Sequence, residues 1–567
     1  MAGMIMQAPA IVILGQGSLE TARRIQQRYP EASIHGLKGR VEGADQDYSS
    51  FGETLRALYR QATPIIALCA AGIVIRSLAS LLDEKGAEPP VLAVAEDGSA
   101  VVPLLGGLAG VNPMARTIGE TLGVAAAITT SGELRFGTCL LNPPEGYALA
   151  DLEQGKRFVS DLLAGESVRI EGDAPWLQQA NLPASDSAQR TIHVGCAARP
   201  ASRDELLIHA RAVVVAVDPG TPELADSVRR ALHEAGIAQG SLACLLAAEQ
   251  TMAEPALHDA AQALGVALRF APAGSGLADM AGKALPQARL HEQDSCVIAV
   301  APGPVEVEQV GQRRGRLAVI GLGPGAAELM VPAVKAELAQ AQDILGYETY
   351  VRMAGPFRDD QVQHCTDNRE EMQRARHAFE LAAQGRSVVV VSSGDPGVFA
   401  MASAVLEALH GSSDQAWHRV ELEILPGVSA SLATAAQAGA PLGHDFCVMS
   451  LSDNLKPWAV IEQRLDLAAQ ADLVLAFYNP ISRSRPWQLG VALDIVRRHR
   501  DGQTPVVLGR DIGRPGQTLK VVSLAELQPE MVDMRTMVLL GSSTTCTFDR
   551  ADGGLWVYTP RWYGAKP

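Results

Sequence analysis

Short apolar runs alternate with segments of helical spacing along almost the whole chain. Such runs are typical of buried strands, and apolar residues three or four positions apart are typical of helices that cover a sheet. The pattern therefore predicts an α/β fold. The expected strands and strand-loop-helix segments are residues 10–15, 64–75, 90–96, 101–123, 191–206, 241–249, 265–273, 317–328, 387–409, 420–446, 471–485, 504–527 and 536–545.

The same pattern divides the chain into several domains. Residues 1–135 and 191–300 each predict an α/β domain, and the less regular residues 136–190 predict a small linking domain. Residues 301–315 are rich in proline, glycine and charge, as linkers are. Residues 316–567 return to the strand-loop-helix pattern and form the last predicted domain.

A glycine-rich loop follows the strand predicted at residues 317–320. Gly321 and Gly323 fit the start of a G-x-G-x-x-G/A dinucleotide fingerprint. Two features count against that interpretation: Pro324 removes a backbone N–H that a phosphate would need, and Pro332 predicts a helix that starts well after the glycines. A strand-to-loop turn without any ligand also remains open.

Composition narrows the possible functions. The chain has 567 residues, 47% of them apolar and 20% charged, which describes a folded protein of several domains. The net charge of −15 argues against binding to nucleic acid or to an anionic membrane. No apolar run reaches about 18 residues, and the first apolar run predicts a strand, not a signal peptide. The eight cysteines form no C-x-x-C pair, so we expect reduced thiols in the cytoplasm and no metal site.

Five loops after predicted strands share small, polar and conformationally unusual residues. They are GLGPG (321–325), SSGDPGVF (392–399), LPGVSAS (425–431), FYNP (477–480) and GSSTT (541–545). Open α/β sheets bind ligands at the carboxyl ends of their strands, so these loops predict a binding site. Together and in this order they resemble the tetrapyrrole methylases, the class III S-adenosylmethionine-dependent methyltransferases. Residues 394–405, 439–465 and 478–485 are similar in particular to the enzymes that methylate precorrin-3B at carbon 17 in cobalamin synthesis.

The resemblance implies a two-lobed methylase fold with the cofactor, S-adenosylmethionine, in the cleft between the lobes. It implies a precorrin-3B substrate, contraction of the macrocycle to precorrin-4 and a homodimer. The residues that it places on the cofactor are Pro324, Ser393, Gly394, Asp395, Phe399, Ser429, Ala430, Tyr478 and Asn479. Gly321 and Gly323 are expected to let the macrocycle approach the backbone.

Charged residues near these loops supply candidates for chemistry. Ring contraction requires a proton to leave a hydroxyl group, so a general base is expected near the cleft. Asp395 and His444 are the candidates, although Asp395 also suits an aspartate that binds its own loop amides and His444 a loop hydrogen-bonder. Arg483 and Arg485 can offer guanidinium groups to the carboxylates of the substrate, or lie solvated at the surface.

The first 300 residues resemble the cobalt-precorrin-5A hydrolases, through residues 69–82, 103–123 and 193–202. The glycine-rich loop at 106–112 carries Leu108 at or beside the place where those enzymes have a histidine. A helix is predicted behind it, with Asn112 as N-cap. Because leucine cannot shuttle protons, we expect this half to be degenerate or accessory, unless His193 substitutes.

Three alternatives stay open at this point. The chain can methylate the cobalt-containing equivalent, cobalt-factor III, with an active lactone-opening N-terminal half. It can be a dinucleotide-dependent oxidoreductase in which Glu348 holds a ribose, although the loops at 392–399 and 477–480 have no role in that scheme. The N-terminal half alone can also be a scaffold that carries corrin intermediates.

Overall fold

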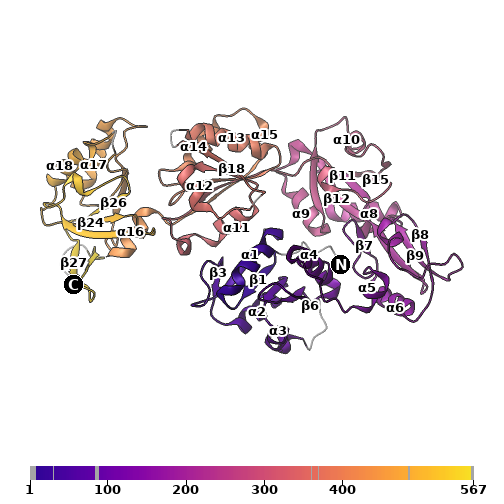
Figure 1. Ribbon diagram of the computed structural model, residues 1–567. Helices are drawn as coiled ribbons and strands as arrows, with labels where there is room; N and C mark the ends of the chain where they lie inside the picture. The colour runs from indigo at the N-terminus through magenta and orange to yellow at the C-terminus, as the bar shows by residue number, and fades with distance from the viewer. Residues whose placement is uncertain are drawn as a thin grey trace. The chain divides into compact units, whose positions relative to one another are not determined.

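A computed structural model describes residues 8–29, 31–82, 88–358, 360–367, 370–482 and 485–562. The chain divides into two compact units, Met1–Arg314 and Gly315–Pro567, and each is described by itself (Figure 1). Among the described residues, no helix is long and apolar enough to cross a membrane.

The first sheet of the N-terminal unit has the strand order β3-β2-β1-β4-β5-β6, in which β6 alone runs antiparallel to its neighbour. Its strands are β1 (Ala10–Ile13), β2 (Ser33–Leu37), β3 (Gln46–Tyr48), β4 (Ile65–Leu68), β5 (Val91–Val94) and β6 (Val101–Leu105). Its helices are α1 (Leu19–Arg28), α2 (Phe51–Arg60), α3 (Ala71–Leu78) and α4 (Val111–Leu122). Helices α1 and α4 pack on the face that carries Ile11, and α2 and α3 pack on the face of Val12.

Two local predictions in this region are wrong. The strand expected at 64–75 ends at Leu68, and α3 begins at Ala71, because Val74 and Leu78 are spaced to bury one face of a helix. Asn112 does not cap α4. Gly110 is the N-cap, and the Asn112 amide donates instead to residues far along the chain.

The second sheet has the order β7-β10-β9-β8 and combines strands on both sides of residue 190, where the pattern placed a boundary. Its strands are β7 (Tyr147–Leu149), β8 (Val168–Glu171), β9 (Arg190–Gly195) and β10 (Glu205–Ala210). Its helices are α5 (Ser131–Phe136), α6 (Leu152–Leu163) and α7 (Pro175–Gln178). The helices bury Phe136, Phe158 and Leu177 in one core against Ile192 of β9.

The third sheet, β13-β12-β11-β15-β14, completes the unit. Its strands are β11 (Val213–Val217), β12 (Leu242–Ala248), β13 (Ala267–Ala271), β14 (Arg289–Glu292) and β15 (Cys296–Val300), with helices α8 (Leu224–Glu234), α9 (Pro255–Leu264) and α10 (Leu277–Ala284). The segment predicted as a linker is bound to this sheet. The buried Arg269 guanidinium donates to the carbonyls of Glu308, Val310 and Gly311, and Phe270 pairs with Gln312.

The C-terminal unit begins with a parallel sheet of order β18-β17-β19-β16-β20, which we call the first lobe. Its strands are β16 (Arg316–Gly321), β17 (Asp343–Tyr347), β18 (Val362–Thr366), β19 (Ser387–Ser392) and β20 (Glu421–Leu425), and its helices are α11 (Pro332–Gln340), α12 (Glu348–Ala354), α13 (Glu371–Ala383), α14 (Met401–His410) and α15 (Gln415–Arg419). Pro332 is the first residue of α11, as predicted. Leu317 faces α13 and α14, whereas Ala318 faces α11 and α12, so helices cover both faces (Figure 1).

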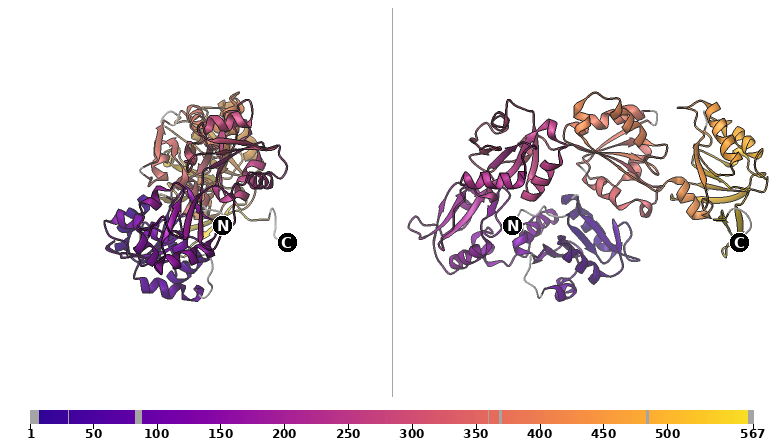
Figure 2. Two further views of the ribbon diagram at one scale, coloured as in Figure 1. Left: turned by 90° about the vertical axis from the view of Figure 1, so that its right-hand side faces the viewer. Right: turned by 180° about the vertical axis from the view of Figure 1, so that it is seen from behind.

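The second lobe is a mixed sheet of order β22-β23-β26-β24-β25. Its strands are β22 (Phe446–Ser450), β23 (Val474–Tyr478), β24 (Pro505–Arg510), β25 (Thr518–Ser523) and β26 (Thr536–Leu540), and its helices are α16 (Ala430–Ala438), α17 (Trp458–Gln470) and α18 (Gln488–Arg497). Helices α17 and α18 cover one face. The right view of Figure 2 shows this lobe from behind. Helix α16 covers the other face, next to the small sheet of β21 (Gly439–Ala440), β28 (Leu555–Tyr558) and β27 (Cys546–Asp549).

Candidate functional site

The loops after β16, β19 and β20 meet at one edge of the first lobe. The three strands run parallel with β16 in the middle, so their carboxyl ends lie side by side. Gly323 donates to the Gly394 carbonyl at 3.1 Å, and Gly394 donates back to the Gly323 carbonyl at 2.8 Å. Two of the motif loops are therefore joined by backbone hydrogen bonds before any ligand is considered.

Glycines at this edge are required by the packing of the loops. A Cβ on Gly427 would lie 2.1 Å from the Gly394 oxygen, and one on Gly321 would lie 2.4 Å from the same atom. Gly323 has a φ of +72°, and a Cβ there would lie 2.8 Å from the Leu329 oxygen. The resemblance assigned Gly321 and Gly323 to the macrocycle, but the structure buries both and gives each a reason that needs no ligand.

Asp395 ties two of these loops together. One carboxylate oxygen accepts the Gly397 amide at 2.8 Å, and the other accepts the Gly427 amide at 3.0 Å. The first bond closes a turn within the β19 loop, and the second reaches the loop after β20. Both oxygens therefore accept backbone hydrogen bonds, and Asp395 joins the β19 loop to the β20 loop; its role as the general base stays a prediction.

The N-terminus of α16 lies against the same edge. A Cβ on Gly394, whose φ is +71°, would come within 3.7 Å of Ser429 Cα and 3.8 Å of the Ala430 nitrogen. Ser429 is the N-cap of α16, and its Oγ lies 3.0 Å from Ser431 Oγ. Gly394, Ser429 and Ala430, three residues predicted to contact the cofactor, are thus brought together.

Tyr478 and Asn479 end β23 on the second lobe. The Tyr478 hydroxyl accepts from the Ser431 amide at 3.1 Å and lies 3.1 Å from Ser431 Oγ, which links it to the start of α16. Asn479 has a φ of +50°, and its Nδ2 donates to Ser450 Oγ at 3.0 Å. Serine hydroxyl groups on neighbouring segments therefore hold both side chains, Ser431 for Tyr478 and Ser450 for Asn479.

An aromatic contact connects the two lobes. The rings of Phe399 and Tyr478 are 5.4 Å apart at 58°, a favourable tilted arrangement. Phe399 is nevertheless 50% exposed, with a φ of +54°. Such exposure of a phenyl ring leaves an apolar surface that a ligand can cover.

Lys456, which the sequence analysis did not single out, lies beside this pair. Its Nζ is 6.0 Å from the centre of the Phe399 ring, within cation–π range. Partial burial lowers the pKa of Lys456, and the neighbouring Arg464 lowers it further. A lone lysine in a polar loop gives no distinctive pattern, so only the fold reveals its place.

Arg514, in the loop after β24, makes a specific contact with the first lobe. Its Nε donates to the Pro324 carbonyl at 2.8 Å, and its Nη2 donates to Ser393 Oγ at 3.1 Å. Both acceptors belong to residues predicted to line the cofactor. The guanidinium also acts on Tyr350, whose pKa is raised by burial and held back by the positive charge of Arg514.

Two predicted features lie at the other edge of the second lobe. His444 precedes β22, whereas Tyr478 ends the parallel neighbour β23, so a strand of five residues separates them. The His444 ring accepts the Asp445 amide at 2.8 Å. The loop at 541–545 follows β26, which runs antiparallel to β23, so it also lies at the amino end of β23. Neither feature reaches the edge where the other motif loops meet.

The predicted basic loop is described in part. Arg483 lies outside the described residues. Arg485 and Ser482 pair through their backbones, and Arg485 Nη1 is buried without a hydrogen bond to any described residue. A buried donor of this kind is available to an acceptor from a ligand.

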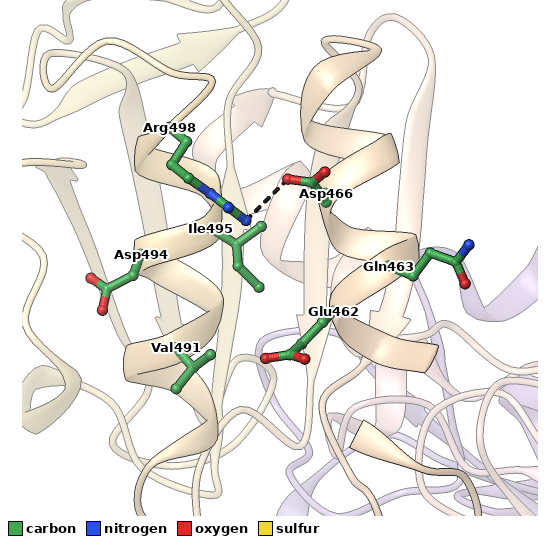
Figure 3. A pocket seen from close by; sticks show the side chains of 7 residues that line it. All are labelled: Glu462, Gln463, Asp466, Val491, Asp494, Ile495 and Arg498. Carbon is green, nitrogen blue, oxygen red and sulfur yellow. Dashed lines mark hydrogen bonds and ion pairs between the residues drawn. The ribbon is translucent and has the colours of Figure 1, made fainter. Parts of the chain in front are cut away.

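A groove of about 550 Å³ lies elsewhere, between α17 and α18 (Figure 3). It is lined by Glu462, Gln463, Asp466, Val491, Asp494, Ile495 and Arg498. Arg498 pairs with Asp466 at 3.1 Å, and none of the predicted site residues lines the groove. The candidate site is therefore the place where the loops after β16, β19 and β20 of the first lobe meet the loop after β23 of the second lobe.

Comparisons with known proteins agree with the division into units. Residues 316–528 match the family model of the tetrapyrrole (corrin/porphyrin) methylases, and residues 53–133 match that of the cobalamin synthesis G N-terminal region. A precorrin-3B C(17)-methyltransferase of a Sinorhizobium species is 50% identical over 249 residues, which are 44% of this chain and 97% of that protein.

A further relative and a solved structure are also similar to this chain. The cobalamin biosynthesis protein CobIJ of Mycobacterium tuberculosis is 47% identical over 274 residues, 47% of this chain and 51% of that protein, so the match spans about half of CobIJ. The crystal structure of the methyltransferase CobJ has 52% sequence identity and a TM-score of 0.41, and the match covers 43% of this chain and 100% of that one.

Proposed function

Because the chain belongs to the tetrapyrrole methylase family, we propose that its C-terminal unit transfers the methyl group of S-adenosylmethionine to carbon 17 of precorrin-3B. The product is precorrin-4, with a contracted macrocycle, in the synthesis of cobalamin. The identity of 50% across 97% of a precorrin-3B C(17)-methyltransferase supports this choice of substrate.

The geometric observation that carries the proposal is the meeting of both lobes at Phe399. This half-exposed ring of the first lobe contacts Tyr478 of the second, and the two sets of loops converge around them. Adenine requires an apolar wall, and the amino acid end of the cofactor requires polar anchors. Phe399 and Tyr478 suit the first need, and Ser393 and Asn479 suit the second.

S-adenosylmethionine, when bound, supplies an already activated methyl group. The protein then has to hold cofactor and substrate at about 3–3.5 Å and in line, and to exclude water. Asp395 contributes to this as the residue that holds the β19 and β20 loops together. In this proposal His444 is not the base, because it precedes β22 and so lies at the amino end of that strand, opposite Tyr478.

For the N-terminal unit we propose an accessory role without lactone opening. Leu108 is 43% exposed, and the resemblance to the hydrolases places it at or beside the position of their histidine. His193 does not replace that histidine, because both of its ring nitrogens lie 2.9 Å from carboxylates, of Glu171 and Glu205. A histidine held between two carboxylates has no ring nitrogen left for a proton transfer to substrate.

The test is incubation of the full chain with labelled S-adenosylmethionine and precorrin-3B, with the cobalt-containing cobalt-factor III in a parallel reaction. We expect label and a mass increase of one methyl group in the precorrin-3B reaction. Label in the cobalt reaction alone would replace our substrate by the alternative, and acetaldehyde released from cobalt-precorrin-5A would contradict the accessory role.

Substrate recognition, assembly and location remain parts of the proposal. Replacing Arg483 and Arg485 by Gln should weaken precorrin binding and leave cofactor affinity unchanged, since only the precorrin carries several carboxylates. Light scattering tests the predicted homodimer. All eight cysteines are free thiols, which supports the cytoplasm as the location.

A further inference from the structure

Arg514 lies in a tight turn between β24 and β25 that docks on the first lobe. The turn is closed by its own hydrogen bonds, from the Arg514 amide to Asp511 and from the Gln517 amide to Arg514. Because β24 runs antiparallel to β26, which in turn runs antiparallel to β23, this turn lies at the same edge of the second lobe as Tyr478. The topology therefore brings Arg514 to the cleft side of that lobe.

The contact between the turn and the first lobe is closely fitted. A Cβ on Gly513 would lie 2.8 Å from Pro324 Cγ, and a Cβ on Gly325 would lie 2.6 Å from Arg514 Cγ. Gly513 and Gly325 also have positive φ angles, of +81° and +138°. Two glycines on opposite lobes thus allow the backbones to approach until the Arg514 side chain reaches its acceptors.

The hydrogen bonds of Arg514 differ from those of the other arginines near this turn. Arg510 and Arg535 form ion pairs with Asp511 and Asp533, all within the second lobe. Arg514 has no carboxylate partner among the described residues. It donates across the cleft instead, to the Pro324 carbonyl after β16 and to the Ser393 hydroxyl after β19.

We propose that Arg514 is a positioning residue for methyl transfer, which fixes the β16 and β19 loops of the first lobe relative to the second. The inference rests on the proposed function. Phe399 and Asp395 belong to the same β19 loop as Ser393, whereas Tyr478 and Asn479 belong to the second lobe. A shift of one lobe against the other therefore separates the two halves of the cofactor site, and a misplacement of about 1 Å costs about 100-fold in rate.

Lysine cannot replace arginine in this role. The guanidinium is planar and directs donors from two different nitrogens, one to each loop, whereas an ammonium group is a single point of charge. The distance between the Pro324 carbonyl and Ser393 Oγ is bridged by Nε and Nη2 together. Arg514→Lys should therefore retain the charge and lose the double contact.

The experiment measures kcat, the KM for precorrin-3B and the Kd for S-adenosylhomocysteine in the full chain, for Arg514→Gln, Arg514→Lys and Gly325→Ala. Gly325→Ala pushes a Cβ against the Arg514 side chain and keeps the guanidinium. Lys520→Gln is the matched control, because it removes one exposed positive charge from β25 of the same hairpin.

We expect all three variants to lower kcat by about 10- to 100-fold and to change the KM for precorrin-3B by less than about threefold. The double variant Arg514→Gln/Gly325→Ala should be no worse than the stronger single variant, because both break one contact. The control should keep the wild-type rate. If Gly325→Ala does not fold, the two Arg514 variants carry the test.

Two results would overturn the inference. One is an unchanged kcat in the folded Arg514 variants. The other is a raised KM for precorrin-3B with an unchanged kcat in Arg514→Gln, which would make Arg514 a substrate contact. Failure of the proposed function is a separate result: the wild-type chain would then neither bind S-adenosylhomocysteine nor transfer a methyl group.

Discussion

Glycine-rich loops follow a strand in both units, at Gly106–Asn112 in the first and at Gly321–Gly325 in the second. In the C-terminal unit the glycines touch the backbones of neighbouring loops, so that Gly321, Gly394 and Gly427 form one packed group. In the N-terminal unit a Cβ on Gly106 would lie 2.5 Å from the Pro89 oxygen, whereas a Cβ on Gly107 would meet no neighbouring segment within 4 Å. The loop of the C-terminal unit belongs to a group of three loops, and the loop of the N-terminal unit packs closely on one neighbouring segment.

The polar groups beside the two loops differ in the same way. Behind Gly106–Asn112, the buried Asn112 amide donates to Glu133 at 2.6 Å, and the Glu133 carboxylate also pairs with Arg116. These groups satisfy one another inside the N-terminal unit. Beside Gly321–Gly325, Ser393 and the Pro324 carbonyl bind Arg514 across a cleft. A glycine-rich loop therefore indicates a binding site only when neighbouring loops and their polar groups converge on it.

The largest expected effect on cofactor binding comes from filling the packed glycine group. Gly427→Ala places a Cβ 2.1 Å from the Gly394 oxygen, a distance that forces the loops apart. We expect a loss of stability of about 1–3 kcal/mol, as for overpacking, together with at least about tenfold weaker binding of S-adenosylhomocysteine. Calorimetry and thermal unfolding measure the two effects.

Gly107→Ala is the matched substitution in the N-terminal unit. Its Cβ meets open space, so we expect wild-type unfolding and wild-type cofactor binding. An equal loss of stability and of S-adenosylhomocysteine binding in both variants would show that the packed glycine group is not specifically required for the cofactor site.

Asp395 and Asp97 provide the next test, since each closes a turn after a strand. Among the described residues, Asp97 accepts hydrogen bonds from Ser99, at 3.0 Å from its amide and 2.6 Å from its hydroxyl, whereas Asp395 also reaches the separate loop of Gly427. Asp395→Ala should cost about 1–3 kcal/mol of stability and about 100-fold or more in methylation rate, because two cofactor loops separate. Asp97→Ala should leave the rate unchanged.

Rates are best measured well below the melting temperature of each variant. If Asp395→Ala lowers the melting temperature but leaves the methylation rate at low temperature unchanged, then Asp395 only stabilises its turn. Such a result would also weaken the distinction between the two loops.

A smaller and local effect is expected in the N-terminal unit from Glu133→Ala. The change leaves the Asn112 amide, which is 2% exposed, without its carboxylate acceptor, at a cost of about 1–3 kcal/mol. Hydrogen exchange should increase in peptides from 101–140, while methylation by the C-terminal unit should not change. Slower methylation in this variant would mean that the two units act together.

Much of the local structure follows from the sequence. Strand β16 and the start of α11 at Pro332 follow from an apolar run and from the preference of proline for the first helical turn. The convergence of the loops after β16, β19, β20 and β23 follows from the rule that ligands bind at the carboxyl ends of parallel strands.

Long-range partners are what the sequence does not reveal. Asparagine is a common helix N-cap, but the side chain of Asn112 donates a hydrogen bond to Glu133, 21 residues away. Arg514 contacts Pro324 across 190 residues, and no local pattern indicates that pair. His444 belongs to a loop of suitable composition, yet strand direction puts it at the wrong edge. Direction and pairing of strands depend on the whole fold.

The smallest expected effect concerns Glu205, which holds His193 in the N-terminal unit. A hydrogen bond from the Ser202 amide is the main cause that lowers the pKa of Glu205 to about 2, and Arg199 and His193 also contribute. Because this pKa is lower in the folded protein than in the unfolded chain, the ionised carboxylate stabilises the fold above about pH 4.5, and this contribution is lost as the pH falls towards 2.

Glu205→Gln should therefore increase hydrogen exchange of residues 190–210 at pH 7, and the difference from wild type should shrink steadily at acidic pH. The control is Asp204→Asn. Asp204 is the residue before Glu205 and forms an ion pair with Arg190 near the surface, so its replacement should change hydrogen exchange little at either pH. A difference for Glu205→Gln that stays constant with pH would show that packing, and not the charge, fixes His193 between its two carboxylates.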